Sequence, residues 1–105
     1  MAVKTDGTLW GWGEGSQGRL GNNDDGGEES PIQVGTLTTW SQVACGSNAS
    51  AAIKTDGTLW TFGSGGAGQL GLGNTTNYSS PVQVGTATDW LLVRGGEQTL
   101  TAIRK

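Results

Sequence analysis

The chain has 105 residues, a formal net charge of −3, and 20 glycines against 2 prolines. Its pI near 4.6 and scattered basic residues argue against nucleic acid or an anionic membrane as a partner, because both attract a basic stripe. With 0 histidines, the chain lacks the commonest general base and metal ligand, and its 1 cysteine allows no internal disulfide. We therefore expect that the protein is not an enzyme and binds no cofactor.

The first predicted element is a β-hairpin around Asp6 and Gly7. A strand stub at 2–4 precedes the Asp-Gly turn, and a second strand follows at 8–13. Asp-Gly between apolar runs favours a two-residue type I′ loop. The same sequence returns around Asp56 and Gly57, and a third copy of its first strand lies at 101–105.

The polar loop at 14–29 follows the first hairpin. It holds the carboxylates Asp24, Asp25, Glu28 and Glu29, which could supply the oxygen ligands that calcium prefers. The equivalent second loop, at 72–79, has no carboxylate. We therefore expect a solvated acidic loop rather than a metal site.

Further short strands are predicted at 31–34, 40–46, 49–54, 81–84, 90–94 and 100–104. Pro31 suits the start of a strand or an edge strand, where no ladder donor is needed. No segment has a period of 3.6 residues, so the chain is predicted to be all-β.

One unit of about 50 residues occurs twice, which is a period typical of propeller blades and related arrays. We divide the chain into repeats at 1–50 and 51–105. The tryptophans that recur at repeat positions are predicted to be core residues, with sugar stacking as the alternative: Trp10, Trp40, Trp60 and Trp90. Trp12, which aligns with Phe62, is also expected in the core, and Cys45 is expected to be a small buried residue.

Three segments together resemble the repeat of the regulator of chromosome condensation family. Their sequence pattern is similar to that of the repeats in bacterial and phage proteins. The three segments are Val43-Ala44-Cys45-Gly46, the hairpin at 51–63, and Gly68-Gln69-Leu70-Gly71. The resemblance implies a β-propeller, usually of about seven blades, with the strand at 43–46 innermost and that at 81–84 outermost. Members carry a histidine shortly after the Cys-Gly pair, where this chain has Ala49, and Thr99 in the next repeat.

In that family's strand order, the chain reads as three strands of one blade, a whole four-stranded blade, and two strands of a third. One repeat cannot bury both of its faces, so we expect closure by oligomerisation or by other blades, with a piece of a longer propeller as the alternative reading of the chain. Copies joined head to tail would carry one strand too many at each junction. We predict that the strand with Ala2 and Val3 gives way to the strand with Leu100, Ala102 and Ile103.

The function predicted from these features is a structural or binding scaffold with a protein partner, in the cytoplasm or a virion. No signal peptide or membrane span of about 20 apolar residues is expected. The alternatives are a guanine-nucleotide exchange factor for a small GTPase, a carbohydrate-binding propeller and a phage virion component.

Overall fold

The computed structural model describes residues 1–13, 20–21, 26–66, 68–96 and 99–104. These residues form three antiparallel sheets, ordered β1-β2-β3, β4-β5-β6-β7 and β8-β9. The strands are β1 (Ala2–Val3), β2 (Leu9–Gly13), β3 (Glu28–Gln33), β4 (Trp40–Cys45), β5 (Ala49–Lys54), β6 (Leu59–Gly63), β7 (Tyr78–Gln83), β8 (Trp90–Gly95) and β9 (Leu100–Arg104). The all-β prediction and its grouping of three, four and two strands are confirmed.

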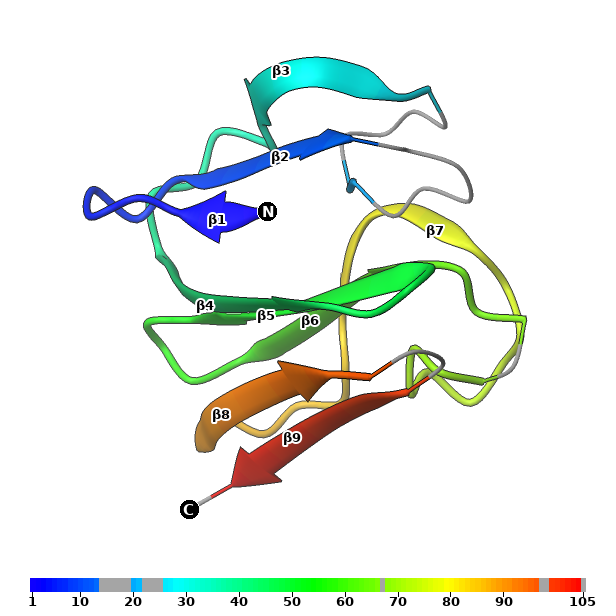
Figure 1. Cartoon of the computed structure of the whole chain (residues 1–105). Coiled ribbons are helices and arrows are strands. Elements are labelled where there is room, and N and C mark those ends of the chain that lie inside the picture. The colour runs from blue at the N-terminus through cyan, green and yellow to red at the C-terminus, as the bar shows by residue number, and fades with distance from the viewer. Residues whose placement is uncertain (14–19, 22–25, 67, 97–98, 105) are drawn as a thin grey trace.

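The three sheets are stacked, with the four-stranded central sheet between the other two (Figure 1). We call them the first sheet (β1–β3), the central sheet (β4–β7) and the last sheet (β8–β9). The N-terminal β1 and the C-terminal β9 therefore lie on opposite sides of the central sheet. Within the described residues, no helix has the length and apolar character that a bilayer crossing needs.

The first hairpin has a three-residue loop rather than the expected two-residue one. The Lys4 amide donates to the Thr8 carbonyl and the Gly7 amide donates to the Lys4 carbonyl, both at 2.9 Å. Gly7 is thus the last of three loop residues, at φ 85°, and Gly57 repeats this at 84°. The type I′ prediction was wrong because a left-handed glycine also closes three-residue loops.

The outer strands β3 and β7 lie at sheet edges and contain the two prolines, Pro31 and Pro81. An edge strand accommodates proline because no ladder partner needs its missing N–H. β3 begins at Glu28, so the strand is longer than the one predicted at 31–34. Both edge strands pair across a register shift that lies beside a glycine of positive φ, Gly13 or Gly63.

Apolar side chains pack between adjacent sheets, because alternate residues of the central strands point to opposite faces. The first core cluster, between the first and central sheets, contains Leu9, Val34, Trp40, Ala52 and Phe62, with Met1, Val3, Val43 and Trp60 packed against it. The second core cluster, between the central and last sheets, contains Ala51, Ile53, Leu59 and Val93, with Ala44, Val84, Trp90, Leu100 and Ala102 packed against it.

Candidate binding surfaces

The second core cluster contains the repeat counterparts of the first, except for two aromatic side chains. Trp60 and Phe62 complete the first cluster from β6 of the central sheet. The last sheet consists of β8 and β9 and has no strand in the place of β6 among the residues that the structure describes. A hollow of about 170 Å³ lies at the second cluster, lined by residues that include Leu59, Leu70 and Val93. Within the described residues, the second core cluster therefore lacks the two aromatic side chains that complete the first.

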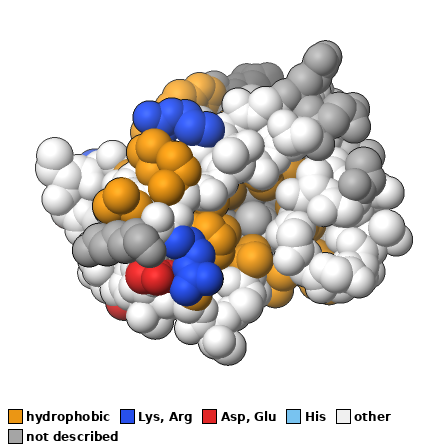
Figure 2. Space-filling model, turned by 90° about the horizontal axis from the view of Figure 1, so that it is seen from below, with side chains coloured by type: hydrophobic (Ala, Val, Ile, Leu, Met, Phe, Trp, Pro, Cys, Tyr) orange, Lys and Arg blue, Asp and Glu red, His pale blue; other side chains and the backbone are white. Residues whose placement is uncertain are grey.

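Apolar residues at the two ends of the stack are exposed, although their counterparts in the central sheet are buried. Ile103 is 50% exposed whereas Ile53 is 3% exposed, and Trp12 is 44% exposed whereas Phe62 is fully buried. Figure 2 views the molecule from the side of the last sheet and shows hydrophobic side chains on this face. Both outer faces thus present residues that a neighbouring sheet covers in the middle of the stack.

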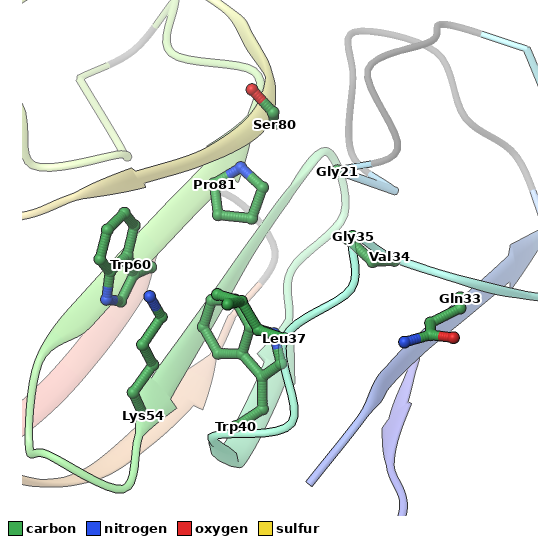
Figure 3. Close-up of a pocket in the computed structure, with 10 residues that line it drawn as sticks. All are labelled: Gly21, Gln33, Val34, Gly35, Leu37, Trp40, Lys54, Trp60, Ser80 and Pro81. Carbon is green, nitrogen blue, oxygen red and sulfur yellow. The ribbon is translucent and has the colours of Figure 1, made fainter.

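A pocket of about 370 Å³ lies between the first and central sheets. Figure 3 shows Trp40, Trp60 and Lys54 on the central sheet, with Leu37 on the segment that joins the two sheets. The two indoles meet edge to face, with ring centroids 6.3 Å apart. The pocket is a mainly apolar recess with one ammonium group.

Lys54 covers part of this aromatic surface. Its Nζ lies 3.9 Å from the ring centroid of Trp60 and 5.3 Å from that of Trp40. Cation–π attraction of this kind orients an ammonium group over the face of an indole. Basic residues recur at the same repeat position: Lys4 lies over Trp10, and Arg104 lies over Trp90. The sequence prediction missed this surface, although the lysine shortly before each Asp-Gly turn was a signal for it.

The carboxylates of both hairpin loops are held by the threonine two residues later. Asp56 Oδ1 accepts hydrogen bonds from Thr58 Oγ1 at 2.6 Å and from the Thr58 amide at 3.1 Å. The side-chain bond, followed by the backbone bond, lowers the pKa of Asp56 below its ordinary value, and Asp6 has the same arrangement with Thr8. Thr58 Oγ1 also accepts from Nε1 of Trp60 at 2.8 Å, so the loop orients a pocket residue.

The family model described as "Regulator of chromosome condensation (RCC1) repeat" matches residues 6–53 and 56–103, and a second model of the same description matches 40–69. The chain belongs to this repeat family.

Two solved propeller structures have similar folds. Human WBSCR16 superposes with a TM-score of 0.80 at 25% identity, over 97% of this chain and 28% of that one. Prp20p from Saccharomyces cerevisiae, whose structure was described with its binding to Gsp1p and histones, has a TM-score of 0.78 at 21% identity, over 95% of this chain and 27% of that one. The chain therefore spans less than a third of each, and the three sheets correspond to part of a repeat propeller.

The four repeat tryptophans lie at different depths. Trp40 is in the first core cluster, and Trp60 and Trp90 pack against the two clusters. Trp10 is half-buried in the first sheet and donates from Nε1 to Thr8 Oγ1 at 2.8 Å. Of the four, Trp40 is buried and the other three are half-buried.

Trp12 and Cys45 are exposed, so the prediction that both are buried was wrong. Trp12 lies on an outer face that no described sheet of this chain covers. Cys45 is the last residue of β4, an edge strand of the central sheet. In both cases the side chain sits at the boundary of the stack rather than within it.

Most of the candidate metal ligands lie outside the residues that the structure describes. Asp24 and Asp25 lie outside the part that the structure describes, as does the side chain of Glu29. Glu28 begins β3 and pairs with Gly13. Among the described residues, no group of at least three His, Cys, Asp or Glu side chains could hold a metal ion.

The strands proposed for self-assembly lie at the two ends of the stack. Ala2 and Val3 form β1 in the first sheet, and Leu100, Ala102 and Ile103 lie in β9 of the last sheet. They are separated by the central sheet, so they do not meet within one chain.

Proposed function

We propose that this chain is a non-enzymatic β-propeller module that acts as a structural or binding scaffold, with its two outer faces covered by further blades. The observation that carries the proposal is the contrast between Ile103, 50% exposed, and Ile53, 3% exposed, at the same repeat position. Burying large apolar side chains is worth about 1.5–3 kcal/mol each, which favours closure by self-assembly or by partner blades.

A protein is the class of partner that the comparisons favour. The similar propeller Prp20p was described with its binding to Gsp1p and histones, which are proteins. The described surface contributes the pocket beside Trp40 and Trp60, which combines apolar area with the Lys54 ammonium. Such a recess suits an apolar anchor side chain that carries or adjoins an acidic group.

A seamless fusion of three copies tests the need for further blades. Joining Lys105 of one copy directly to Asp6 of the next continues the repeat without the surplus strand. We expect the fused chain to unfold in one cooperative transition, at a higher temperature than the single chain at low concentration. The same fusion with Ile103→Asp at each junction is the matched control. No gain in melting temperature over the single chain would contradict the proposal.

A nucleotide-release assay separates the scaffold from the alternative of an exchange factor. The assay measures loss of labelled GDP from a small GTPase with and without the chain. We expect no acceleration by the single chain or by the fused one. Acceleration by either would contradict the non-enzymatic proposal.

A further inference from the structure

We propose that β2 and β3 of a second copy of this chain complete the last sheet, and that Trp10 and Trp12 of that copy fill the second core cluster. The inference rests on the proposed function, in which further blades cover the outer faces, and it identifies those blades. One hybrid blade would then contain β8 and β9 of one copy followed by β2 and β3 of the next.

The edge of β9 that pairs with no described strand carries the repeat counterparts of the β5 residues that pair with β6. β5 pairs with β6 through five Cα partners, with Ala51 opposite Thr61. β9 follows β5 at the repeat offset and pairs with β8 in the register that β5 keeps with β4. Applied to β9, the β5–β6 register puts Thr101 opposite Gly11 of the second copy. This fixes the alignment of the two strands, because a slip of one residue would turn every side chain to the other face.

β1 pairs with the edge of β2 over fewer residues than β9 of another copy would. It makes two Cα pairs, Ala2 with Trp10 and Val3 with Leu9. β5 makes five pairs with the equivalent strand β6. β9 would place Ala102 and Ile103 at the positions of Ala2 and Val3 and extend the pairing toward Trp12. We therefore expect β1 to be displaced, since it gives up fewer cross-strand contacts than β9 gains.

The second core cluster lacks the side chains that β2 of another copy would bring. In the first core cluster, β6 contributes Phe62 and also Trp60, which packs against the cluster. Trp10 and Trp12 occupy the same repeat positions in β2. In the hybrid blade they would point toward the central sheet of the first copy, over the hollow of about 170 Å³. The exposed Trp12 would thereby become as enclosed as Phe62.

The opposite face of the hybrid blade would also gain a partner. Val3 packs against the first core cluster, and Ile103 would take its place there in the second copy.

Arg104 already lies 5.6 Å from the ring centroid of Trp90. It would lie between that ring and Trp10 of the second copy, as Lys54 lies between Trp40 and Trp60. The same contact between two copies would therefore cover both Trp12 and Ile103.

The contact is head to tail, because β2 and β9 lie on opposite sides of the central sheet in one chain (Figure 1). Contacts of this type form a ring when the rotation closes. Each copy supplies one complete blade and shares one hybrid blade at each end, which amounts to two blades per copy. Three copies would give six blades and four copies eight, whereas seven would need a blade from another source.

Cysteine cross-linking between two differently labelled chains tests the strand register. Cys45→Ser first removes the single, exposed cysteine. One chain then carries Gly11→Cys and the other Thr101→Cys. A Cβ on Gly11 would lie 3.0 Å from the flexible end of Met1, in the segment expected to move, so this substitution is tolerated. The matched control replaces Thr101→Cys by Leu100→Cys, whose thiol points to the other face.

We expect a covalent heterodimer, at twice the 10.7 kDa chain mass, from the Gly11→Cys and Thr101→Cys mixture. The control mixture should give about tenfold less, because its thiols lie on opposite faces of the sheet. Equal cross-linking in both mixtures, or in neither, would overturn the proposal. A higher mass by light scattering without the register-specific cross-link would overturn it too, while leaving the scaffold function intact.

Trp12→Ser in the unlabelled chain provides a second measurement. Since Trp12 is exposed in the single chain, its loss should leave the far-ultraviolet circular dichroism unchanged. We expect light scattering at micromolar concentration to report a multiple of 10.7 kDa for the wild type and a shift toward the single-chain mass for Trp12→Ser. A monomeric wild-type chain, or a variant that assembles equally well, would overturn the proposal. Failure of the three-copy fusion would contradict the proposed function separately.

Discussion

Gly21 lies against the ring of Phe62, so closely that a Cβ on Gly21 would come within 2.7 Å of Cδ2. Gly21 also has a φ of +70°, which disfavours any L side chain. We expect Gly21→Ala to lower the free energy of unfolding by about 2–4 kcal/mol, from left-handed strain together with overpacking. Urea unfolding at low protein concentration measures the loss.

Gly71→Ala is the matched control for that substitution. Gly71 has a φ of +69°, but the nearest atom to its Cβ would be 3.7 Å away, on Val84. We expect only the strain of the left-handed backbone, about 1–2 kcal/mol. Equal losses for the two variants would contradict the role of packing between the first and central sheets.

Phe62→Ala should be the most destabilising single truncation on the central sheet. Phe62 is fully buried in the first core cluster, so truncation leaves a cavity and costs about 3–5 kcal/mol. Trp12→Ala, at the equivalent but exposed position, should change the unfolding free energy of the single chain far less. Both values come from urea unfolding, and similar losses would show that Trp12 is packed within one chain.

Lys54→Met should weaken the central sheet by removing the ammonium group while keeping an apolar stem. The group lies 3.9 Å from the centroid of Trp60, and interactions of this kind contribute about 0.5–2 kcal/mol. Lys4→Met, whose ammonium lies 5.2 Å from Trp10, should cost less. Thermal unfolding followed by tryptophan fluorescence reports both changes, and an equal or reversed order would refute the assignment.

The hairpin carboxylates should make stability depend on pH below about 4. Hydrogen bonds from Thr58 lower the folded-state pKa of Asp56 below its ordinary value of 3.8. The resulting stabilisation is therefore present above the unfolded-state pKa and is lost as the pH falls through the folded-state pKa.

Asp56→Asn tests this dependence. Its deficit in unfolding free energy relative to the wild type should be largest near neutral pH and shrink as the pH falls below 3.8. Thr58→Val, which keeps the carboxylate but removes the hydroxyl donor, should reduce the same pH slope. A deficit that stays constant with pH would show that the carboxylate charge plays no part.

The all-β architecture and the strand grouping could be predicted because they follow from local and repeated signals. Each Asp-Gly loop marks a hairpin, and the offset between Trp10 and Trp60 fixes which strands correspond. The length of the loop could not be predicted. It depends on whether Gly7 is the second or third loop residue, which is a matter of backbone register rather than of composition.

Burial was harder to predict because it depends on the neighbouring sheet. Trp12 and Phe62 occupy one repeat position, yet one is 44% exposed and the other fully buried. The pocket was also missed: Lys54 comes from β5 and Trp60 from β6, while Leu37 lies on the segment between sheets. These residues come together only when the strands pair and the sheets stack, so the sequence of a single repeat does not reveal the pocket.

The pocket beside Trp40 and Trp60 is lined from positions that recur along the chain. A closed propeller would therefore repeat the recess between successive blades, alternating between a version with Lys54 and one with Arg104. A partner with regularly spaced copies of one chemical group could occupy several recesses together. Even weak single contacts would then add up to tight attachment through effective concentration, which suits a multimeric protein surface.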